Sequence, residues 1–146
     1  MIQDTLVEVR RFLSVVSEGS APNELTLILA LDRLVMSYHA APDCDAAEED
    51  SEPPEFDWTA LYQRMATRFP DYGMYIVADP LGGIDESPMV GDAIDDLADI
   101  IRDMREVVWR SENLGDDDAH WYLRLMFFHW GKHARELSLY LHARQF

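Results

Sequence analysis

The chain has 146 residues, 48% of them hydrophobic and 11% aromatic, which is enough apolar material for one folded domain spanning residues 1–146. Its formal charge is −16, so it would repel a phosphate backbone or an anionic membrane, and we expect neither nucleic acid nor membrane as a partner. A single cysteine, Cys44, excludes an internal disulfide and, with no signal-peptide pattern at residues 1–20, predicts a cytoplasmic protein.

Two helices are predicted in the first 40 residues. Apolar residues between positions 2 and 18 repeat at helical spacing, and Gly19 should end that helix. A second helix follows over residues 25–38, with Ser20 as the expected N-cap. Because apolar side chains lie on nearly every side of this second helix, we expect the rest of the protein to cover most of its surface.

The next segment, residues 42–57, carries eight acids and no base. Such a block of like charges is typical of a solvated loop, and the alternative is a docking surface for a basic protein partner. The carboxylates of Asp43 and Asp45 should disfavour the Cys44 thiolate, so we do not expect a reactive cysteine.

The second half of the chain predicts three more helices and one short extended segment. Asp57 can cap a third helix over residues 58–69, and the apolar residues 72–79 are rich in β-formers. That segment could pack alone on the helices, or pair with the same segment of a second copy in a homodimer. Helices over 92–112 and 118–144 follow, the last capped by Asp116, Asp117 or Asp118. The predicted fold is an all-α antiparallel bundle of about five helices.

One line of residues on the final helix marks the candidate site. At about 100° per residue, a strip about 60° wide contains both histidines of the sequence His129-x-x-x-His133. We therefore expect both imidazoles to point into the protein, where they need hydrogen-bond partners or a metal. The strip also holds Tyr122, Glu136 and Tyr140, and the opposite, water-facing side should hold Arg124, Gly131, Arg135, Ser138 and His142.

The preceding helix supplies carboxylates at a matching spacing. Asp96, Asp99 and Asp103 share one face with Asp92, and the short connection to the final helix makes the two helices antiparallel neighbours. Asp99 and Asp103 should lie level with His129 and His133, whereas we assign Asp92 and Asp95 to capping or solvent. The candidate site residues are Asp96, Asp99, Asp103, His129 and His133.

Three interpretations of this site remain open from the sequence. The leading one is a buried polar network that fixes helix register in a non-enzymatic interaction or scaffold module. The second is a divalent metal site in a hydrolase-like protein, with the histidines and the aspartates as ligands. The third is an anion or partner pocket that uses protonated histidines and arginine. The sequence gives no support to a serine or cysteine nucleophile.

The same two stretches carry a family resemblance. Asp95-Asp96-Leu97-Ala98-Asp99-Ile100-Ile101-Arg102-Asp103 and His129-Trp130-Gly131-Lys132-His133 resemble a bacterial helical family named domain of unknown function 5063. The resemblance implies the helical fold and the paired-helix site at these five aspartate and histidine positions, and implies no activity.

A weaker likeness concerns the all-α nucleoside-triphosphate pyrophosphatases, which hold magnesium with carboxylates on bundle helices. Asp96-x-x-Asp99 looks like their second acidic pair. The first pair, Glu-x-x-Glu on an earlier helix, has no counterpart, because the second predicted helix offers only Asp32. This enzymatic interpretation therefore ranks below the others.

Overall fold

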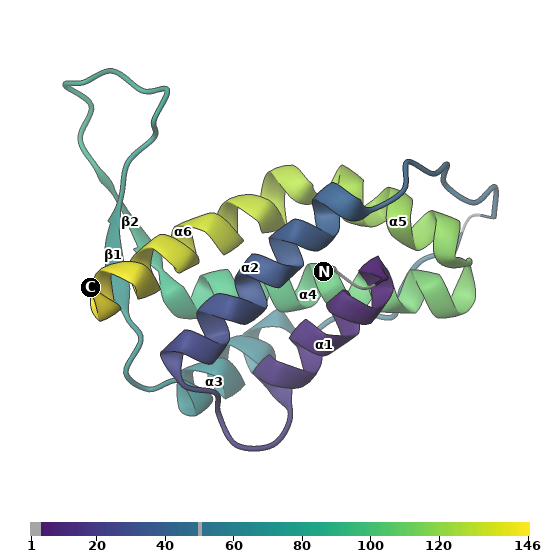
Figure 1. Ribbon diagram of the computed structural model, residues 1–146, viewed down its shortest axis with the longest axis horizontal. Coiled ribbons are helices and arrows are strands. Elements are labelled where there is room, and N and C mark those ends of the chain that lie inside the picture. The colour runs from purple at the N-terminus through teal and green to yellow at the C-terminus, as the bar shows by residue number, and fades with distance from the viewer. Residues whose placement is uncertain (1–3, 50) are drawn as a thin grey trace.

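The longest helix, α4 (Ala93–Asn113), lies at the centre of the fold in a computed structural model that describes residues 4–49 and 51–146. It packs against α1, α3, α5, α6 and β2, and its buried residues surround much of its circumference. The other elements of the described residues are α1 (Thr5–Ser17), α2 (Glu24–Ala40), α3 (Trp58–Arg68), β1 (Met74–Val77), β2 (Met89–Asp92), α5 (Asp116–Leu125) and α6 (Phe127–Gln145) (Figure 1).

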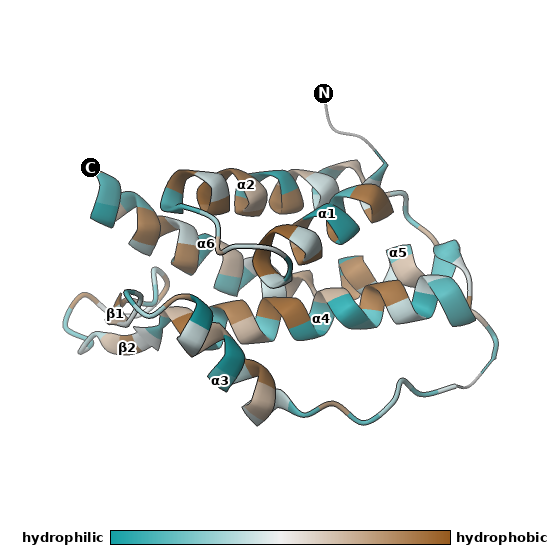
Figure 2. Ribbon diagram, turned by 90° about the horizontal axis from the view of Figure 1, so that it is seen from below, coloured by the Kyte–Doolittle hydropathy of each residue, from teal (hydrophilic) through white to brown (hydrophobic). Residues whose placement is uncertain are grey.

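One hydrophobic core joins the helices. Figure 2 shows hydrophobic residues recurring along α1, α2, α4 and α6, while the acidic segment between α2 and α3 runs around the outside. The all-α single-domain prediction is confirmed, with six helices and a small hairpin in the described residues. None of the described helices has both the length and the apolar character needed to cross a bilayer.

The turn between α1 and α2 explains why one predicted cap is wrong. The guanidinium of Arg68 on α3 donates to the backbone carbonyls of Val15, Glu18, Gly19 and Ser20. These bonds hold the turn in a non-helical path, so α2 begins later, with Asn23 instead of Ser20 as its N-cap. Helix α1 ends before Gly19 as predicted and starts after its own cap, Asp4, whereas residues 2 and 3 of the predicted helix lie outside the described residues.

The predicted central position of α2 is also wrong. Leu25, Leu29 and Met36 are each more than half exposed, because α2 packs against α1 on one side and α6 on another. Its buried side is held to α1 by a bidentate ion pair from Arg33 to the buried Glu8, with a shortest distance of 2.7 Å. Apolar residues on all sides of a helix therefore did not imply burial on all sides.

The acidic segment has no helix or strand across residues 42–49 and 51–57, as predicted, and Asp50 lies outside the described residues. Its start is nevertheless held against α5. The backbone N–H of Ala47 donates to Asp118 over 3.0 Å, and Arg124 donates to the carbonyl of Ala41 over 3.3 Å. Asp118 is itself buried and accepts a second bond from Arg110.

The extended segment pairs within the chain. Strand β1 forms an antiparallel hairpin with β2, in a register that puts Tyr75 opposite Gly91. A segment packed alone, or paired with a second copy through this edge, is therefore not what the structure has. Strand β2 was not predicted from the sequence, because the strand is only four residues long and contains a glycine. That glycine has a steric role, since a Cβ at Gly91 would lie 2.7 Å from the Tyr75 ring.

The predicted final helix is two helices, α5 and α6, which meet at Met126. At this junction the indole N–H of the buried Trp130 donates to the Leu123 carbonyl over 2.9 Å, so a side chain helps to satisfy the backbone. Helix α5 begins after Gly115, which has a φ of 107° and provides no side-chain cap. The predicted aspartate cap is therefore wrong, and Asp116, Asp117 and Asp118 all lie in the first turn.

The buried face of α6 differs from the predicted one by part of a turn. Its fully buried residues are Trp130, Ala134, Leu137 and Leu141, and the histidine strip lies beside them on the edge toward α4. Gly131, predicted to face water, is buried because the Phe127 ring lies over it. A Cβ at that glycine would lie 2.5 Å from the ring.

Candidate functional site

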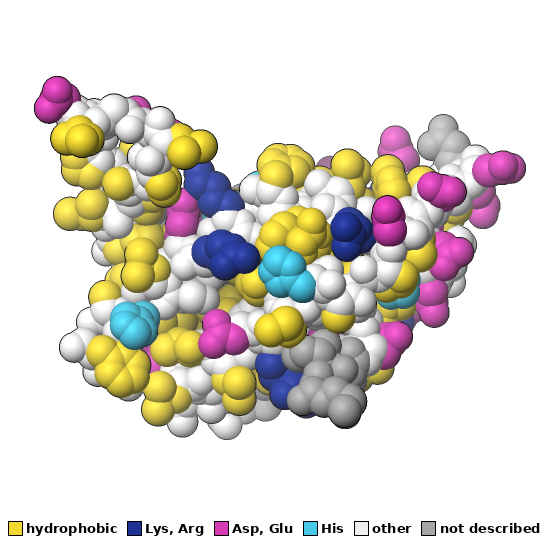
Figure 3. Space-filling model, turned by 45° about the horizontal axis from the view of Figure 1, so that its top comes forward, with side chains coloured by type: hydrophobic (Ala, Val, Ile, Leu, Met, Phe, Trp, Pro, Cys, Tyr) yellow, Lys and Arg dark blue, Asp and Glu magenta, His cyan; other side chains and the backbone are white. Residues whose placement is uncertain are grey.

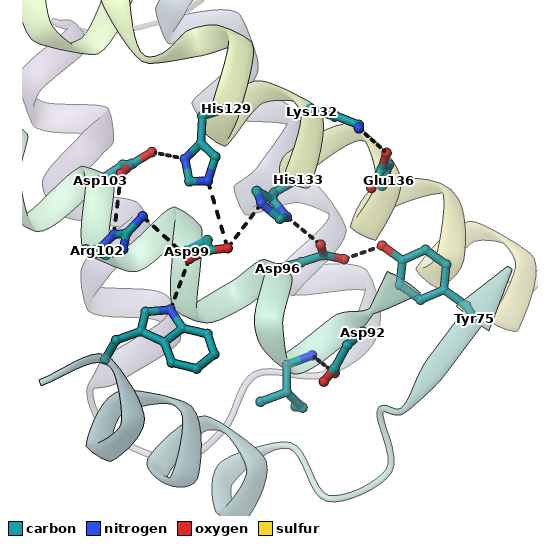
Figure 4. A network of polar contacts seen from close by, with 12 residues as sticks. Tyr75, Asp92, Asp96, Asp99, Arg102, Asp103, His129, Lys132, His133 and Glu136 are labelled. Carbon is teal, nitrogen blue, oxygen red and sulfur yellow. Dashed lines mark hydrogen bonds and ion pairs between the residues drawn. The ribbon is translucent and has the colours of Figure 1, made fainter. Parts of the chain in front are cut away.

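The acidic strip of α4 faces the two histidines of α6. Nδ1 of His133 lies 2.6 Å from Oδ1 of Asp96, and Nδ1 of His129 lies 2.7 Å from Oδ2 of Asp103 (Figure 4). The order of the pairs is reversed along the two helices, as antiparallel packing requires. Both carboxylates are only 2% exposed, so the predicted Asp–His contacts are present as a buried network.

Asp99 lies between these two pairs and contacts both rings. Its Oδ2 atom is 3.2 Å from Nε2 of His133 and 3.9 Å from Nε2 of His129. Its Oδ1 atom accepts a hydrogen bond from the indole N–H of Trp58 over 3.0 Å. The two imidazoles meet edge to face with their centroids 4.9 Å apart, so both Nε2 atoms point toward a single carboxylate oxygen.

Two aromatic residues complete the network, and the sequence did not identify either of them as part of it. Trp58 on α3 fixes Asp99, and the hydroxyl of Tyr75 on β1 donates a hydrogen bond to Oδ2 of Asp96. The sequence placed Trp58 in an apolar stripe and Tyr75 in a segment of β-formers. Their polar atoms were the available signal, because an indole N–H or a phenol O–H needs a partner when its ring is buried.

The electrostatics of the network favour a charged His133. Burial alone lowers the pKa of this imidazole, but hydrogen bonds to Asp96 and Asp99 outweigh burial and raise the pKa to about 10. Burial raises the pKa of Asp99, yet the hydrogen bond from His133 holds it below its usual value. The pKa of Asp103 is raised because burial outweighs its bond to His129. Without a bound ion, His133 is therefore an imidazolium held between two carboxylates.

The first turn of α4 holds the two aspartates that we assigned to capping or solvent. Asp92 caps the helix through the N–H of Ile94 and also accepts the hydroxyl of Tyr62 over 2.6 Å. Asp95 is half-buried, and burial followed by the charge of Asp99 raises its pKa. Asp95 is thus closer to the network than a solvated residue would be.

Two sets of potential metal ligands come together here in the described residues. Asp99, His129 and His133 form one set, and Asp95, Asp96 and His133 form the other, each with its ligand atoms within 4.8 Å of one another. Asp96 and Asp103, two of the five residues expected at the site, contact the Nδ1 atoms of the rings. They therefore lie on the opposite side of the rings from the Nε2 atoms, which face Asp99. The histidine side chains are 25% and 20% exposed, so an ion can reach them from solvent.

A groove borders the network on the side of the hairpin. It has a volume of about 690 Å³ and lies between α6 and residues 75–81. Figure 3 shows the hairpin standing away from the helical body, with basic side chains at the base of the notch and acidic side chains gathered at the opposite end of the molecule. Lys132, the only lysine of the chain, borders this groove, is exposed and lies 3.8 Å from Glu136.

Cys44 lies away from the network, next to α5. Desolvation raises the pKa of its thiol, and a hydrogen bond to Asp117 and the charges of Asp43 and Asp45 add to the effect. The expectation that the acidic neighbours disfavour the thiolate is therefore confirmed, with burial as the larger cause.

The whole fold is similar to that of a solved structure. Protein BF1032 from Bacteroides fragilis, a target of the Northeast Structural Genomics Consortium, superposes with a TM-score of 0.74 at 15% identity, covering 98% of this chain and 90% of that one. No family model and no curated protein matches the sequence. At this identity the likeness shows the fold alone, and the resemblance to domain of unknown function 5063 stays a prediction.

Proposed function

We propose that the chain is a metal-binding helical protein in which Asp99, His129 and His133 hold a divalent transition-metal ion. The observation that carries the proposal is the convergence of both Nε2 atoms on one oxygen of Asp99, at 3.2 and 3.9 Å. Donor atoms on a shared ion lie about 3.0–3.5 Å apart, so a small inward movement, with release of the His133 Nε2 proton to solvent as the ion binds, completes the site.

The hydrogen bonds around these three residues match what a metal site needs. A metal-bound imidazole usually donates its other ring N–H to a carboxylate, which fixes the tautomer and the ring orientation. Here Asp103 and Asp96 occupy those positions at 2.7 and 2.6 Å, and Trp58 leaves Oδ2 of Asp99 free to face the rings. A purely structural network explains His133 well but leaves Nε2 of His129 3.9 Å from its nearest carboxylate, beyond hydrogen-bond distance.

The ligand types narrow the choice of ion. Two imidazoles and a carboxylate suit Zn²⁺ or Fe²⁺, whereas Mg²⁺ and Mn²⁺ prefer oxygen ligands. Three protein ligands also leave positions for water, which makes metal-dependent hydrolysis the enzymatic form of this proposal. The structure adds no support for the pyrophosphatase interpretation. Asp32 is exposed on α2 and belongs to none of the potential ligand sets in the described residues.

Elemental analysis and metal titration test the proposal. We expect tight binding of Zn²⁺ and weak binding of Mg²⁺ and Mn²⁺, with one equivalent of Zn²⁺ lost in Asp99→Asn and in His129→Gln. Asp103→Asn, which removes only the outer carboxylate, should weaken binding by about 10–100-fold. His142→Gln is the matched control, because His142 is exposed on the same helix.

Two results would count against the metal centre. One is a protein whose ion content is the same in Asp99→Asn, His129→Gln and the control. The other is a thermal unfolding midpoint that does not respond to added Zn²⁺, since an ion that binds only the folded state must stabilise it.

A second candidate function is an interaction module, favoured by the exposed apolar side chains of the hairpin. Met74, Ile76 and Val90, together with Leu81 and Ile84 in the connecting loop, are each more than half exposed. Such a patch is typical of a protein interface, here a homodimer formed through the hairpin. Light scattering with Ile76→Asp tests it, since a dimer that persists in this variant would not use the hairpin. A basic partner for the acidic segment 42–57 stays a prediction.

A further inference from the structure

His120 is a buried histidine without a hydrogen-bond partner among the described residues. It lies on α5 and is 8% exposed, and neither of its ring nitrogens has a hydrogen-bond partner in the described part of the chain. A neutral imidazole carries one donor and one acceptor, and leaving both buried and unpaired is unfavourable. Native proteins rarely tolerate this, so an unmet pair of nitrogens points to a group that the chain itself does not supply.

Two potential ligands lie next to this ring. The Sγ atom of Cys44, a carboxylate oxygen of Asp117 and a ring nitrogen of His120 all lie within 4.8 Å of one another. Asp117 and His120 are three residues apart on α5 and therefore share one side of the helix. Cys44 comes from the acidic segment, so the set joins a loop to a helix across more than 70 residues of sequence.

The loop is brought to this position without any ion. Ala47 donates its N–H to Asp118 over 3.0 Å, and Arg124 donates to the Ala41 carbonyl over 3.3 Å, so contacts on both sides of Cys44 hold it near α5. A small surface pocket of about 250 Å³, lined by Cys44, Trp121 and Arg124 among others, gives an approach from solvent. The thiol is therefore placed and accessible.

We infer that Cys44, Asp117 and His120 form a second divalent metal site, of the zinc type. Thiolate, imidazole and carboxylate are the ligands of Zn²⁺, with Zn–S near 2.3 Å and Zn–N and Zn–O near 2.0–2.2 Å. Donor atoms around a tetrahedral zinc lie about 3.3–3.6 Å apart, so a closing movement of about 1 Å completes the set. The Zn–S bond forms as the thiol proton leaves to solvent, and the fourth position is open to water or to a carboxylate of the loop.

This site depends on no part of the Asp99 centre. Its ligands come from α5 and the acidic segment, whereas the other set comes from α4 and α6. An ion here ties the acidic segment to the helical body in the way that a disulfide would, but reversibly and from a single cysteine. Chelation should therefore loosen the part of the loop around Cys44, while the bonds of Ala47 and Ala41 remain and the bundle stays folded.

Cobalt reports on this site separately, because only a thiolate gives a cobalt charge-transfer band in the near ultraviolet. The experiment uses the reduced full chain carrying Asp99→Asn, so that the other centre is silent. We expect a band that saturates at one equivalent of Co²⁺ and that Zn²⁺ abolishes. In Cys44→Ser the band disappears, and in His120→Gln the apparent dissociation constant rises by more than about 100-fold.

Matched variants separate a built site from adventitious binding. Asp45→Asn, next to Cys44 and outside the set, should keep the band, while Asp117→Asn, an exposed residue whose change should not disturb folding, should weaken it. The inference is overturned if no band forms, or if the band is unchanged in His120→Gln, because cobalt would then be binding the thiol and loose acids alone.

Limited proteolysis gives a second measurement that does not depend on spectra. A glutamate-specific protease should cut the segment 42–57, and Zn²⁺ should slow that cleavage in the parent chain. Equal slowing of cleavage in His120→Gln, or no slowing in the unsubstituted chain, would rule out the proposed metal site at Cys44, Asp117 and His120. A negative result in these tests would not count against the proposed metal site at Asp99. A protein that binds no ion at Asp99 should still give the expected results here.

Discussion

The histidines of α6 and the histidine of α5 occupy opposite chemical environments. His133 has a carboxylate oxygen within 3.2 Å of each ring nitrogen, and His129 has one at 2.7 Å, so the network is nearly satisfied by the chain alone. His120 is more deeply buried and has no hydrogen-bond partner in the described residues. An imidazole can thus be held by the carboxylates of the chain before any ion binds, as in α6, or be buried without such a partner, as in α5.

We expect the largest effect on stability from removing the His133 partner of Asp96. In metal-free protein, His133→Ala leaves the buried Asp96 carboxylate without its main cation. Because the ring is 20% exposed, we expect a loss of about 2–3 kcal/mol in the free energy of unfolding, below the range for fully buried pairs. Urea denaturation measures it, with the exposed His142→Ala as a control that should change stability by less than about 0.5 kcal/mol.

The same pair should appear in the pH dependence of stability. The pKa of His133 is about 10 in the folded chain, above its unfolded value of about 6.5, so its contribution is fully present below pH 6.5 and is lost as the pH rises toward 10. The difference in stability between wild type and His133→Gln should shrink across that window. A constant difference from pH 6.5 to 10 would show that the ring is not held as an imidazolium.

A smaller loss is expected where β1 supports the network. Tyr75→Phe removes the hydroxyl that donates to Asp96 and leaves the ring in place. Hydrogen bonds to charged groups contribute about 1.5–3 kcal/mol, and a half-buried tyrosine belongs at the low end, so we expect about 1.5 kcal/mol. Calorimetry of metal-free protein measures it, and an unchanged midpoint would mean that water replaces the hydroxyl without loss.

A substitution at His120 should change the free energy of unfolding in the opposite direction. His120→Leu removes two unsatisfied nitrogens and should raise the stability of metal-free protein by about 1 kcal/mol. Added Zn²⁺ should then stabilise wild type more than the variant, because only wild type keeps the second ligand set. A destabilised variant without metal would instead show that the imidazole has a partner, such as a bound water.

The sequence predicted the first of these environments and missed the second for a physical reason. Helical periodicity places Asp96, Asp99 and Asp103 on one face and His129 and His133 on another, and antiparallel packing of neighbouring helices fixes their register. Cys44 and His120 meet only because the loop folds back onto α5 through Ala47 and Asp118, a contact that no local pattern specifies. The missed hairpin has the same cause, since β2 is defined by its partner more than by its own four residues.

The single lysine gives the molecule an unusual chemical handle. Apart from its terminal amine, the chain has one primary amine, the exposed Nζ of Lys132 on α6. Lys132 is three residues after His129 in the sequence and borders the groove beneath the hairpin. An amine-reactive fluorophore would therefore attach beside the paired histidines without any engineered residue. The emission of a fluorophore on Lys132 could follow ligand entry, hairpin movement or self-association.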